Sequence, residues 1–372
     1  MISFLHYLEE ADRLRHLSHA EDRMIESGRS GFRQAFNTLH GLHKFLRGKE
    51  SGITLNTKAD GAPSVVFGRN PDNNRFFVAS KSAWNKTPKL NYTEKDIETN
   101  HAKAPGLVVK LKQALKHLPK VTPKTGVYQG DFMYSKGEVK DVGNKREFTP
   151  NTITYRAGKD TPYGRKMETA KIGVAVHTAY HGPSFSSLQP DYEATDRGFK
   201  SHPDVHVTTF RNTGKAEYTD HRQSRVRWAL GRAFQRHRDI NYNAIKGSEP
   251  HMQMYVNNTV RTNQRPTVKG YYEFLRSRPD AKSEHFDAVR NNTKDFKNVF
   301  AAHGYLELAK NTIVHALDAH QDLEHSIGGQ PSGPEGYVAI KKNVPTKIIK
   351  RRSDKLGPAF SASNFFQGRF QK

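Results

Sequence analysis

The spacing of apolar residues predicts helices at the start of the chain. Within residues 1–50, apolar side chains recur three and four positions apart, first from Ile2 to Leu8 and then from Phe32 to Leu46. This spacing places them on one face of an α-helix. We therefore expect an N-terminal helical segment over residues 1–50.

Residues 51–182 contain shorter apolar runs that Gly, Pro, Asn and Asp interrupt, a pattern typical of strands joined by turns. One longer run, residues 105–118, has helical spacing, with Pro105 suited to its first turn and Pro119 ending it. The expected strands are residues 53–57, 63–68, 75–80, 127–134, 153–155 and 172–180.

Helical spacing returns in the second half of the chain. Residues 183–215 are predicted as loops, helices are expected over 222–238 and 295–325, and strands return at 336–340 and 346–350. A helical insertion of about 100 residues thus interrupts a strand-rich domain, and the two ends of such an insertion lie close together. The predicted segments are the N-terminal helices (1–50), the first part of the core (51–182), a mostly helical insertion (183–330), and the final strands with a basic tail (331–372).

The net charge of the chain indicates a binding partner. The 372 residues include 60 Lys and Arg against 37 Asp and Glu, a formal net charge of +23. Such a positive chain attracts polyanions, above all nucleic acid, because neutralising phosphates releases their counterions. The 21 Phe and 15 Tyr supply a core although only 35% of the residues are hydrophobic.

The chain has no cysteine, which excludes disulfides, cysteine nucleophiles and thiolate zinc sites. No stretch approaches the ~18 apolar residues of a membrane span, and no N-terminal run has the character of a signal peptide. We therefore expect a cytoplasmic monomer without a membrane partner, located in the host cytoplasm if a phage encodes it.

The strongest chemical candidate is the run Lys58-Ala59-Asp60-Gly61 between two predicted strands. Lysine amines form covalent intermediates when their pKa is lowered or their partner is well placed. Lys58 is expected to attack the α-phosphate of a nucleoside triphosphate and to release pyrophosphate, while Gly61 permits a close backbone approach. Taken alone, the run also fits an ordinary surface turn.

Two acids and a lysine elsewhere support the chemical interpretation. Asp131 follows a glycine inside an apolar strand, and Glu335 stands at the start of another, with Lys347 a few residues later. Carboxylates such as Asp131 and Glu335 suit Mg²⁺ or Mn²⁺, which neutralise triphosphate charge. Lys347 is expected to bind the transferring phosphate.

In this order, the motifs resemble those of the covalent nucleotidyltransferase superfamily, which comprises ATP-dependent DNA and RNA ligases and mRNA-capping enzymes. The run from Lys58 to Gly61 looks like its nucleophile motif, and Lys81, Asp131, Glu335 and Lys347 look like parts of its later motifs. Residues 172–180 stand where its base-stacking aromatic is expected. The first 180 residues also resemble an uncharacterised tailed-phage branch with a Lys-x-Asp-Gly-Ala-Pro run.

The resemblance implies an α+β fold with an antiparallel-sheet, ATP-grasp-like ligase core. The catalytic residues it implies are Lys58, Asp60, Asp131, Glu335 and Lys347. The implied nucleotide-binding residues are Asn56, Thr57, Lys58, Gly61, Lys81, His177, Lys347 and Lys350, and the implied cofactors are ATP, with GTP as the alternative, and Mg²⁺ or Mn²⁺.

The sequence departs from the superfamily pattern in three places. Lys347 is followed by Lys350 rather than by a lysine two residues on, and strand alternation puts the two on opposite faces. His177 and Tyr180 replace a clear base-stacking Phe. Too few residues follow Lys347 for a C-terminal OB-fold, so the insertion or the N-terminal helices are expected to take over its role.

The predicted helix 222–238 carries six arginines among Trp228, Leu230 and Phe234. We expect the apolar side chains to face a core and the arginines to reach phosphates and bases. The predicted nucleic-acid contacts are Arg222, Arg225, Arg227, Arg232, Arg236, Arg351 and Arg352.

These inferences predict an ATP-dependent polynucleotide ligase acting on DNA or RNA through a lysyl-AMP intermediate. A capping-type guanylyltransferase is the first alternative, and labelling with ATP or GTP distinguishes the two. The second alternative is a non-catalytic, basic nucleic-acid-binding or virion protein that keeps the fold.

Overall fold

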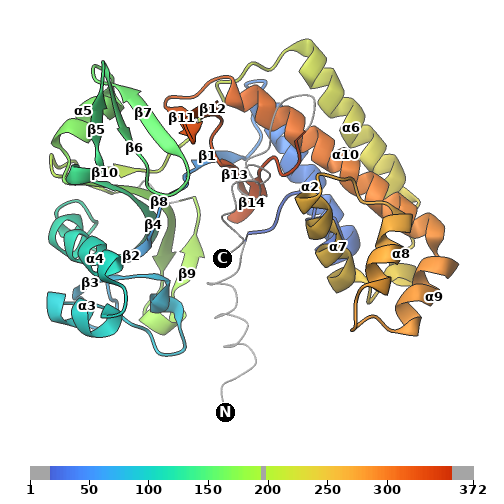
Figure 1. Cartoon of the computed structure of the whole chain (residues 1–372), viewed down its shortest axis with the longest axis horizontal. Coiled ribbons are helices and arrows are strands. Elements are labelled where there is room, and N and C mark those ends of the chain that lie inside the picture. Colours follow the sequence, from blue (N-terminus) through green and yellow to red (C-terminus); the bar gives the residue numbers. More distant parts are fainter. Residues whose placement is uncertain (1–16, 194–197, 354–372) are drawn as a thin grey trace. The chain divides into compact units, whose positions relative to one another are not determined.

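The computed structural model describes residues 17–193 and 198–353, which form two compact units of mixed α and β structure (Figure 1). Of the described residues, unit 1 comprises 56–211 and 322–335, and unit 2 comprises 17–55, 212–321 and 336–353. The mixed α+β class predicted from the sequence is confirmed.

Unit 1 is built on two sheets. The larger sheet has the order β10-β8-β4-β2-β3, with β9 paired to β8, and the smaller one has the order β12-β11-β7-β6-β5. Neighbouring strands are antiparallel apart from the parallel pair β10 and β8. The strands are β2 (Ser64–Arg69), β3 (Phe76–Ala79), β4 (Val127–Ser135), β5 (Lys140–Val142), β6 (Lys145–Phe148), β7 (Thr154–Gly158), β8 (Ile172–His181), β9 (Gln189–Asp191), β10 (Val205–Thr208), β11 (Glu324–Ile327) and β12 (Gln330–Ser332).

The larger sheet of unit 1 is buried on both faces. Val65 and Phe67 of β2 pack in one apolar cluster with Leu111 of α4 (Pro105–His117), whereas Val66 belongs to a second cluster with Trp84. Alternate residues of a strand point to opposite faces, so a continuous apolar run fills both clusters. The remaining α-helices of this unit are α3 (Glu94–His101) and α5 (Pro162–Thr169), and the short helix η1 spans Lys81–Trp84.

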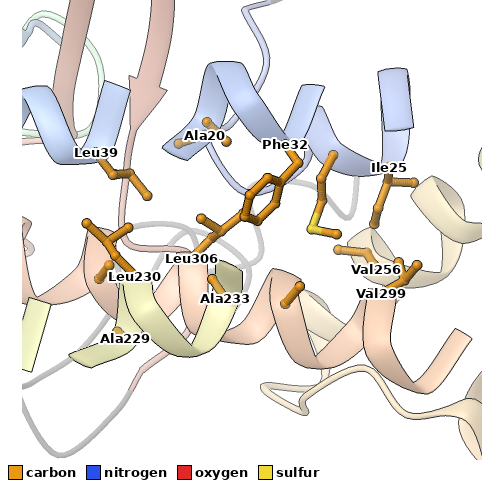
Figure 2. Packing of buried hydrophobic residues seen from close by; sticks show 14 of the residues in the cluster. Ala20, Ile25, Phe32, Leu39, Ala229, Leu230, Ala233, Val256, Val299 and Leu306 are labelled. Atoms are coloured by element: carbon orange, nitrogen blue, oxygen red, sulfur yellow. The ribbon is translucent and has the colours of Figure 1, made fainter. Parts of the chain in front are cut away.

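Unit 2 is mainly helical and has one large apolar core. Figure 2 shows Phe32 and Leu39 of α2, Leu230 of α6, and Leu306 of α10 packed in this core. Each of these side chains is fully or almost fully buried, which stabilises the unit by about 1.5–3 kcal/mol per large side chain. The α-helices are α2 (Arg23–Phe45), α6 (Asp220–Arg238), α7 (Glu249–Arg261), α8 (Val268–Arg276), α9 (Ser283–Asn291) and α10 (Thr293–Asp318).

A small sheet ordered β1-β13-β14 completes the list of strands. Strands β13 (Gly336–Lys341) and β14 (Val344–Ile348) are antiparallel and belong to unit 2, and Tyr337 and Ile348 join its core. Strand β1 (Thr54–Lys58) begins in unit 2 and ends in unit 1.

Most periodic segments were predicted correctly, including the helix that starts at Pro105 and the helix over 222–238. The predicted helix 295–325 is wrong at its end, because α10 stops at Asp318 and residues 324–327 form β11, which pairs with β7. The predicted strand 346–350 instead spans Val344–Ile348, so Lys350 lies beyond it. The predicted loop 183–215 contains β9 and β10, and the run Ile2 to Leu8 lies outside the described residues.

The units also group the chain differently from the predicted segments. Helix α2, from the N-terminal segment, packs with α6 and α10 of the insertion. The final segment 331–372 is divided after Glu335, since β13 and β14 belong to unit 2. Across the described part of the chain, no helix combines the length and the apolar character needed to span a bilayer.

Candidate functional site

Lys58 and Glu335 form an ion pair in unit 1. The ammonium Nζ of Lys58 donates a hydrogen bond of 2.5 Å to Oε2 of Glu335, although the residues are 277 positions apart. Both side chains retain some exposure, 28% for Lys58 and 16% for Glu335. A reagent in solvent can therefore reach the amine, and the carboxylate is in position to orient it and to take its proton.

Asp131 lies beside the turn that follows Lys58. It pairs with Ser64 across β4 and β2, and Ala62 N–H donates to the carbonyl of Phe132 at 3.0 Å. A Cβ at Gly61 would come within 2.5 Å of the Asp131 Cβ. Gly61 is thus required so that the turn can lie against β4, which brings Lys58 and Asp131 into one region of the unit.

A β-bulge directs His177 toward Asp131. Gln129 pairs with Thr178 and Gly130 with Val176, which leaves His177 as an extra residue in β8. Its Nε2 lies 4.0 Å from Oδ2 of Asp131. A Cβ at Gly130 would lie 2.4 Å from the carbonyl oxygen of Ala175, so glycine is needed for this close strand approach.

Charges from several elements act on Asp131 and His177. Burial raises the pKa of Asp131, while the positive charges of His177, Lys58 and Lys81 act to lower it. Desolvation lowers the pKa of His177, and the positive charges of Lys58 and Lys81 lower it further. The negative charge of Asp131 acts to raise it. One group of charges that act on each other therefore includes Lys58, Lys81, Asp131 and His177. Glu335 belongs to it through its ion pair with Lys58.

Asp60 has a structural role, and its catalytic role remains a prediction. The residue is 7% exposed, and its carboxylate accepts hydrogen bonds from Asn151 Nδ2 (2.6 Å), Thr152 N (2.7 Å) and Ile153 N (2.9 Å). Its own N–H donates to the hydroxyl of Tyr155 at 2.7 Å. Both carboxylate oxygens are thus occupied by the segment that leads into β7, and Asp60 fixes the turn that follows Lys58.

Two other predicted nucleotide-binding residues also have backbone roles. Asn56 is buried and forms an antiparallel bridge with Arg211. Thr57 N–H donates to the carbonyl of Phe210 at 2.9 Å. These contacts hold the end of β1 in unit 1 and so position Lys58, the next residue.

The structure separates the two candidates for base stacking. Tyr180 is buried against Trp84, with ring centroids 4.5 Å apart, and its hydroxyl donates to Gln129 Oε1 at 2.8 Å. Trp84 Nε1 donates to the same oxygen at 3.1 Å. Tyr180 is therefore a core residue, whereas the His177 side chain keeps 44% exposure.

Lys347 and Lys350 belong to unit 2 and not to the unit that contains Lys58. The backbone of Lys347 bonds to Ser18 and Ala20, and its side chain is half-buried. Lys350 is buried, and its charge acts on Asp318. The predicted phosphate-binding role of the two lysines remains a prediction.

Arg351 and Arg352 correct the predicted nucleic-acid contacts. Arg351 Nη2 lies 3.0 Å from Oε1 of Glu21, and Arg352 Nη1 lies 2.5 Å from Oε1 of Glu307. Both guanidinium groups are buried in unit 2. Buried arginines that are neutralised by carboxylates are held inside the unit, where they do not reach phosphates in solvent.

The predicted arginines of α6 do lie on a helix, but the predicted burial of its apolar residues Trp228, Leu230 and Phe234 is only partly correct. Leu230 is in the core, whereas Trp228 is 54% and Phe234 46% exposed. The positions on this helix that were predicted to contact nucleic acid are Arg222, Arg225, Arg227, Arg232 and Arg236, each partly or largely exposed.

Two carboxylates remain as predicted metal ligands. Within residues 17–193 and 198–353, no three His, Asp or Glu side chains form a cluster suited to a metal ion. Asp131 and Glu335 nevertheless offer the hard oxygens that Mg²⁺ takes when substrate phosphates and water complete its coordination. Asp131 and Glu335 therefore remain predicted ligands for a metal that arrives with a phosphate ligand.

Sequence reasoning missed Tyr155 and Asn151, which hold Asp60, and Gln129, which bonds to Ser64 of β2. The partners of Asp60 are 91 to 95 positions away. No local pattern marks a contact of that range, although a buried aspartate needs such donors.

Comparison with known proteins gives one family. The family described as "Family of unknown function (DUF6267)" matches residues 14–369. No curated protein and no solved structure shows significant similarity to the chain. Since the match covers nearly the whole sequence, the chain belongs to this family of unknown function, DUF6267.

Proposed function

We propose that the chain is a covalent nucleotidyltransferase, and specifically an ATP-dependent polynucleotide ligase that uses Lys58 as its nucleophile. The observation that carries the proposal is the 2.5 Å contact between Lys58 Nζ and Glu335 Oε2, in a region that also holds Asp131, His177 and Lys81. The antiparallel sheets of unit 1 and the net charge of +23 support it.

In the first step, Glu335 takes a proton from the Lys58 ammonium, and the free amine attacks the α-phosphorus of ATP. A P–N bond forms, the bond from the α-phosphorus to the bridging oxygen breaks, and pyrophosphate leaves. Mg²⁺ or Mn²⁺ held through Asp131 and Glu335 would neutralise the charge of the triphosphate. Lys81 adds positive charge near the same phosphates.

In the later steps, an oxygen of a nucleic-acid 5′-phosphate attacks the lysyl-AMP phosphorus and the P–N bond breaks, so that Lys58 regains its proton. A 3′-hydroxyl then attacks the activated 5′-phosphate, with loss of its proton, and AMP leaves as the phosphodiester forms. In this scheme His177, which desolvation favours in its neutral form, contacts the nucleotide near Asp131.

The test is covalent labelling with α-³²P-labelled ATP or GTP and Mg²⁺, followed by denaturing electrophoresis. The expected result is a label that survives denaturation, is lost in Lys58→Ala, and is acid-labile as a phosphoramidate. Lys112→Ala is a matched control, because Lys112 is 29% exposed and lies 2.5 Å from Glu98. Label with GTP alone would select the capping-type guanylyltransferase, and no label with either nucleotide would refute the covalent mechanism.

A further inference from the structure

Helix α6 presents an unusual exposed surface in unit 2. Its buried side chains, among them Leu230 and Ala233, face α2 and α10, as Figure 2 shows. Trp228 and Phe234 lie at the borders of its exposed side and are two of the few large apolar side chains that remain exposed among the described residues. Exposed apolar surface that is rimmed by polar residues marks interaction sites.

Arginines surround both rings. Helix α6 contains six arginines and, within Asp220–Arg238, one acidic residue. The hydrogen bonds of Arg227 and Arg232 go to the neutral side chains of Ser224 (2.9 Å) and Gln235 (3.1 Å). Such bonds orient the guanidinium groups without cancelling their charge.

The two aromatic positions are held by neighbouring helices. Trp228 meets Tyr305 of α10 edge-on, with centroids 5.5 Å apart, and Arg232 lies over the same tyrosine at 5.8 Å. Phe234 contacts Phe36 of α2 with centroids 6.0 Å apart. The rings are thus held against α2 and α10 while one side of each stays open.

Helix α2 and the residues after it extend the positive charge along the edge of α6. Burial, then the charges of Arg47 and Arg227, lower the pKa of His43 to about 4. Burial, then Arg29 and Arg33, lower the pKa of His237 to about 4. His43 lies beside Tyr218, just before α6 begins, and His237 lies in the last turn of α6. Arginines from α2, α6 and the segment after α2 therefore act near both ends of α6.

We propose that the exposed face of α6, centred on Trp228 and Phe234 and flanked by Arg227 and Arg232, binds single-stranded nucleic acid. Stacking on exposed rings requires unpaired bases, because paired bases are already stacked on their neighbours. The arginines contact phosphates, which gives binding without sequence preference. This surface acts independently of the chemistry at Lys58.

Tryptophan fluorescence gives a direct readout, because the chain has two tryptophans and Trp84 is buried in unit 1. An oligo(dT) strand of about 12 nucleotides should quench the exposed tryptophan, and the quenching should vanish in Trp228→Phe, which keeps the stacking ring. Affinity is measured separately by the anisotropy of an end-labelled strand, and Trp228→Ala should weaken binding roughly tenfold. Lys58→Ala should bind as tightly as the unchanged protein, so failure of the lysine chemistry would leave this result intact.

The role of the arginine charges is tested with the double variant Arg227→Gln/Arg232→Gln. The slope of log K against log salt concentration should become about 1.4 less steep in this variant. Arg276→Gln is the matched control, because Arg276 of α8 also lies over a tyrosine ring, 5.1 Å from the centroid of Tyr272. Urea unfolding of each variant checks that unit 2 is intact. Equal affinity for a duplex, absence of Trp228 quenching, or equal effects of the α6 and α8 substitutions would each overturn the proposal.

Discussion

Replacing Asp60 should destabilise unit 1, because its carboxylate fixes the turn after Lys58. The carboxylate accepts three hydrogen bonds of 2.6 to 2.9 Å, two of them from the backbone N–H groups of Thr152 and Ile153. Asp60→Ala leaves these donors unpaired in a buried place. Each unsatisfied donor costs about 1–3 kcal/mol, so the expected loss in the free energy of unfolding is about 3–5 kcal/mol.

Asp60→Asn should cost less, about 1–2 kcal/mol, because one amide oxygen can keep both backbone bonds while the negative charge is lost. The loss is measured by urea unfolding in a Trp228→Phe background, where the fluorescence of Trp84 reports unit 1 alone. Trp84 is buried and bonded to Gln129, so its emission changes when the unit opens.

The matched control is Asp96→Ala. Asp96 also accepts two backbone hydrogen bonds of 2.9 Å, from Tyr92 and Thr93, but near solvent at the start of α3. Water can replace those bonds, and the expected cost is about 1 kcal/mol. If Asp60→Ala costs no more than Asp96→Ala, the structural role of Asp60 is refuted.

Three further predictions concern other buried or paired charges. Glu335→Gln should slow lysine labelling about 100-fold in a single-turnover assay, because it removes the group that takes the proton, and wild-type labelling would contradict this. Burial lowers the pKa values of His206 and His325 to about 4, so the unfolded state binds protons first as the pH falls below 6.5. Unit 1 should therefore lose about 2 kcal/mol per histidine between pH 7.5 and pH 5, measured by urea unfolding, and His206→Gln should reduce that pH dependence. Glu21→Gln leaves the buried Arg351 without its full partner and should destabilise unit 2 by about 3–5 kcal/mol, read as a lower urea midpoint.

The periodic segments of this fold were predictable because local spacing determines them. Strand β4 and helix α4 were predicted within a residue or two, since each has an uninterrupted apolar pattern and a proline or glycine at its boundary. The end of α10 was not predictable in this way. The run after Asp318 keeps helical spacing, and only its pairing with β7 makes residues 324–327 a strand.

The charge run at the end of β14 shows the limit of reasoning from local composition. Arg351 and Arg352 follow several lysines, and such a run is usually solvated. Their partners Glu21 and Glu307 are 330 and 45 positions away. A pairing over these distances is a property of the folded chain, so the sequence supports an exposed basic tail and the structure a buried ion-pair network.

The same reasoning separates the two acids associated with Lys58. In the sequence, Asp60 is the closer one and was assigned to chemistry, but the fold directs it toward residues 151–153. Glu335, 277 positions away, is the carboxylate that contacts the amine. The two roles predict opposite outcomes, because Asp60→Asn should lower stability while each folded molecule can still be labelled. Glu335→Gln should leave the urea midpoint of unit 1 nearly unchanged, since the pair is partly exposed, and reduce the label instead.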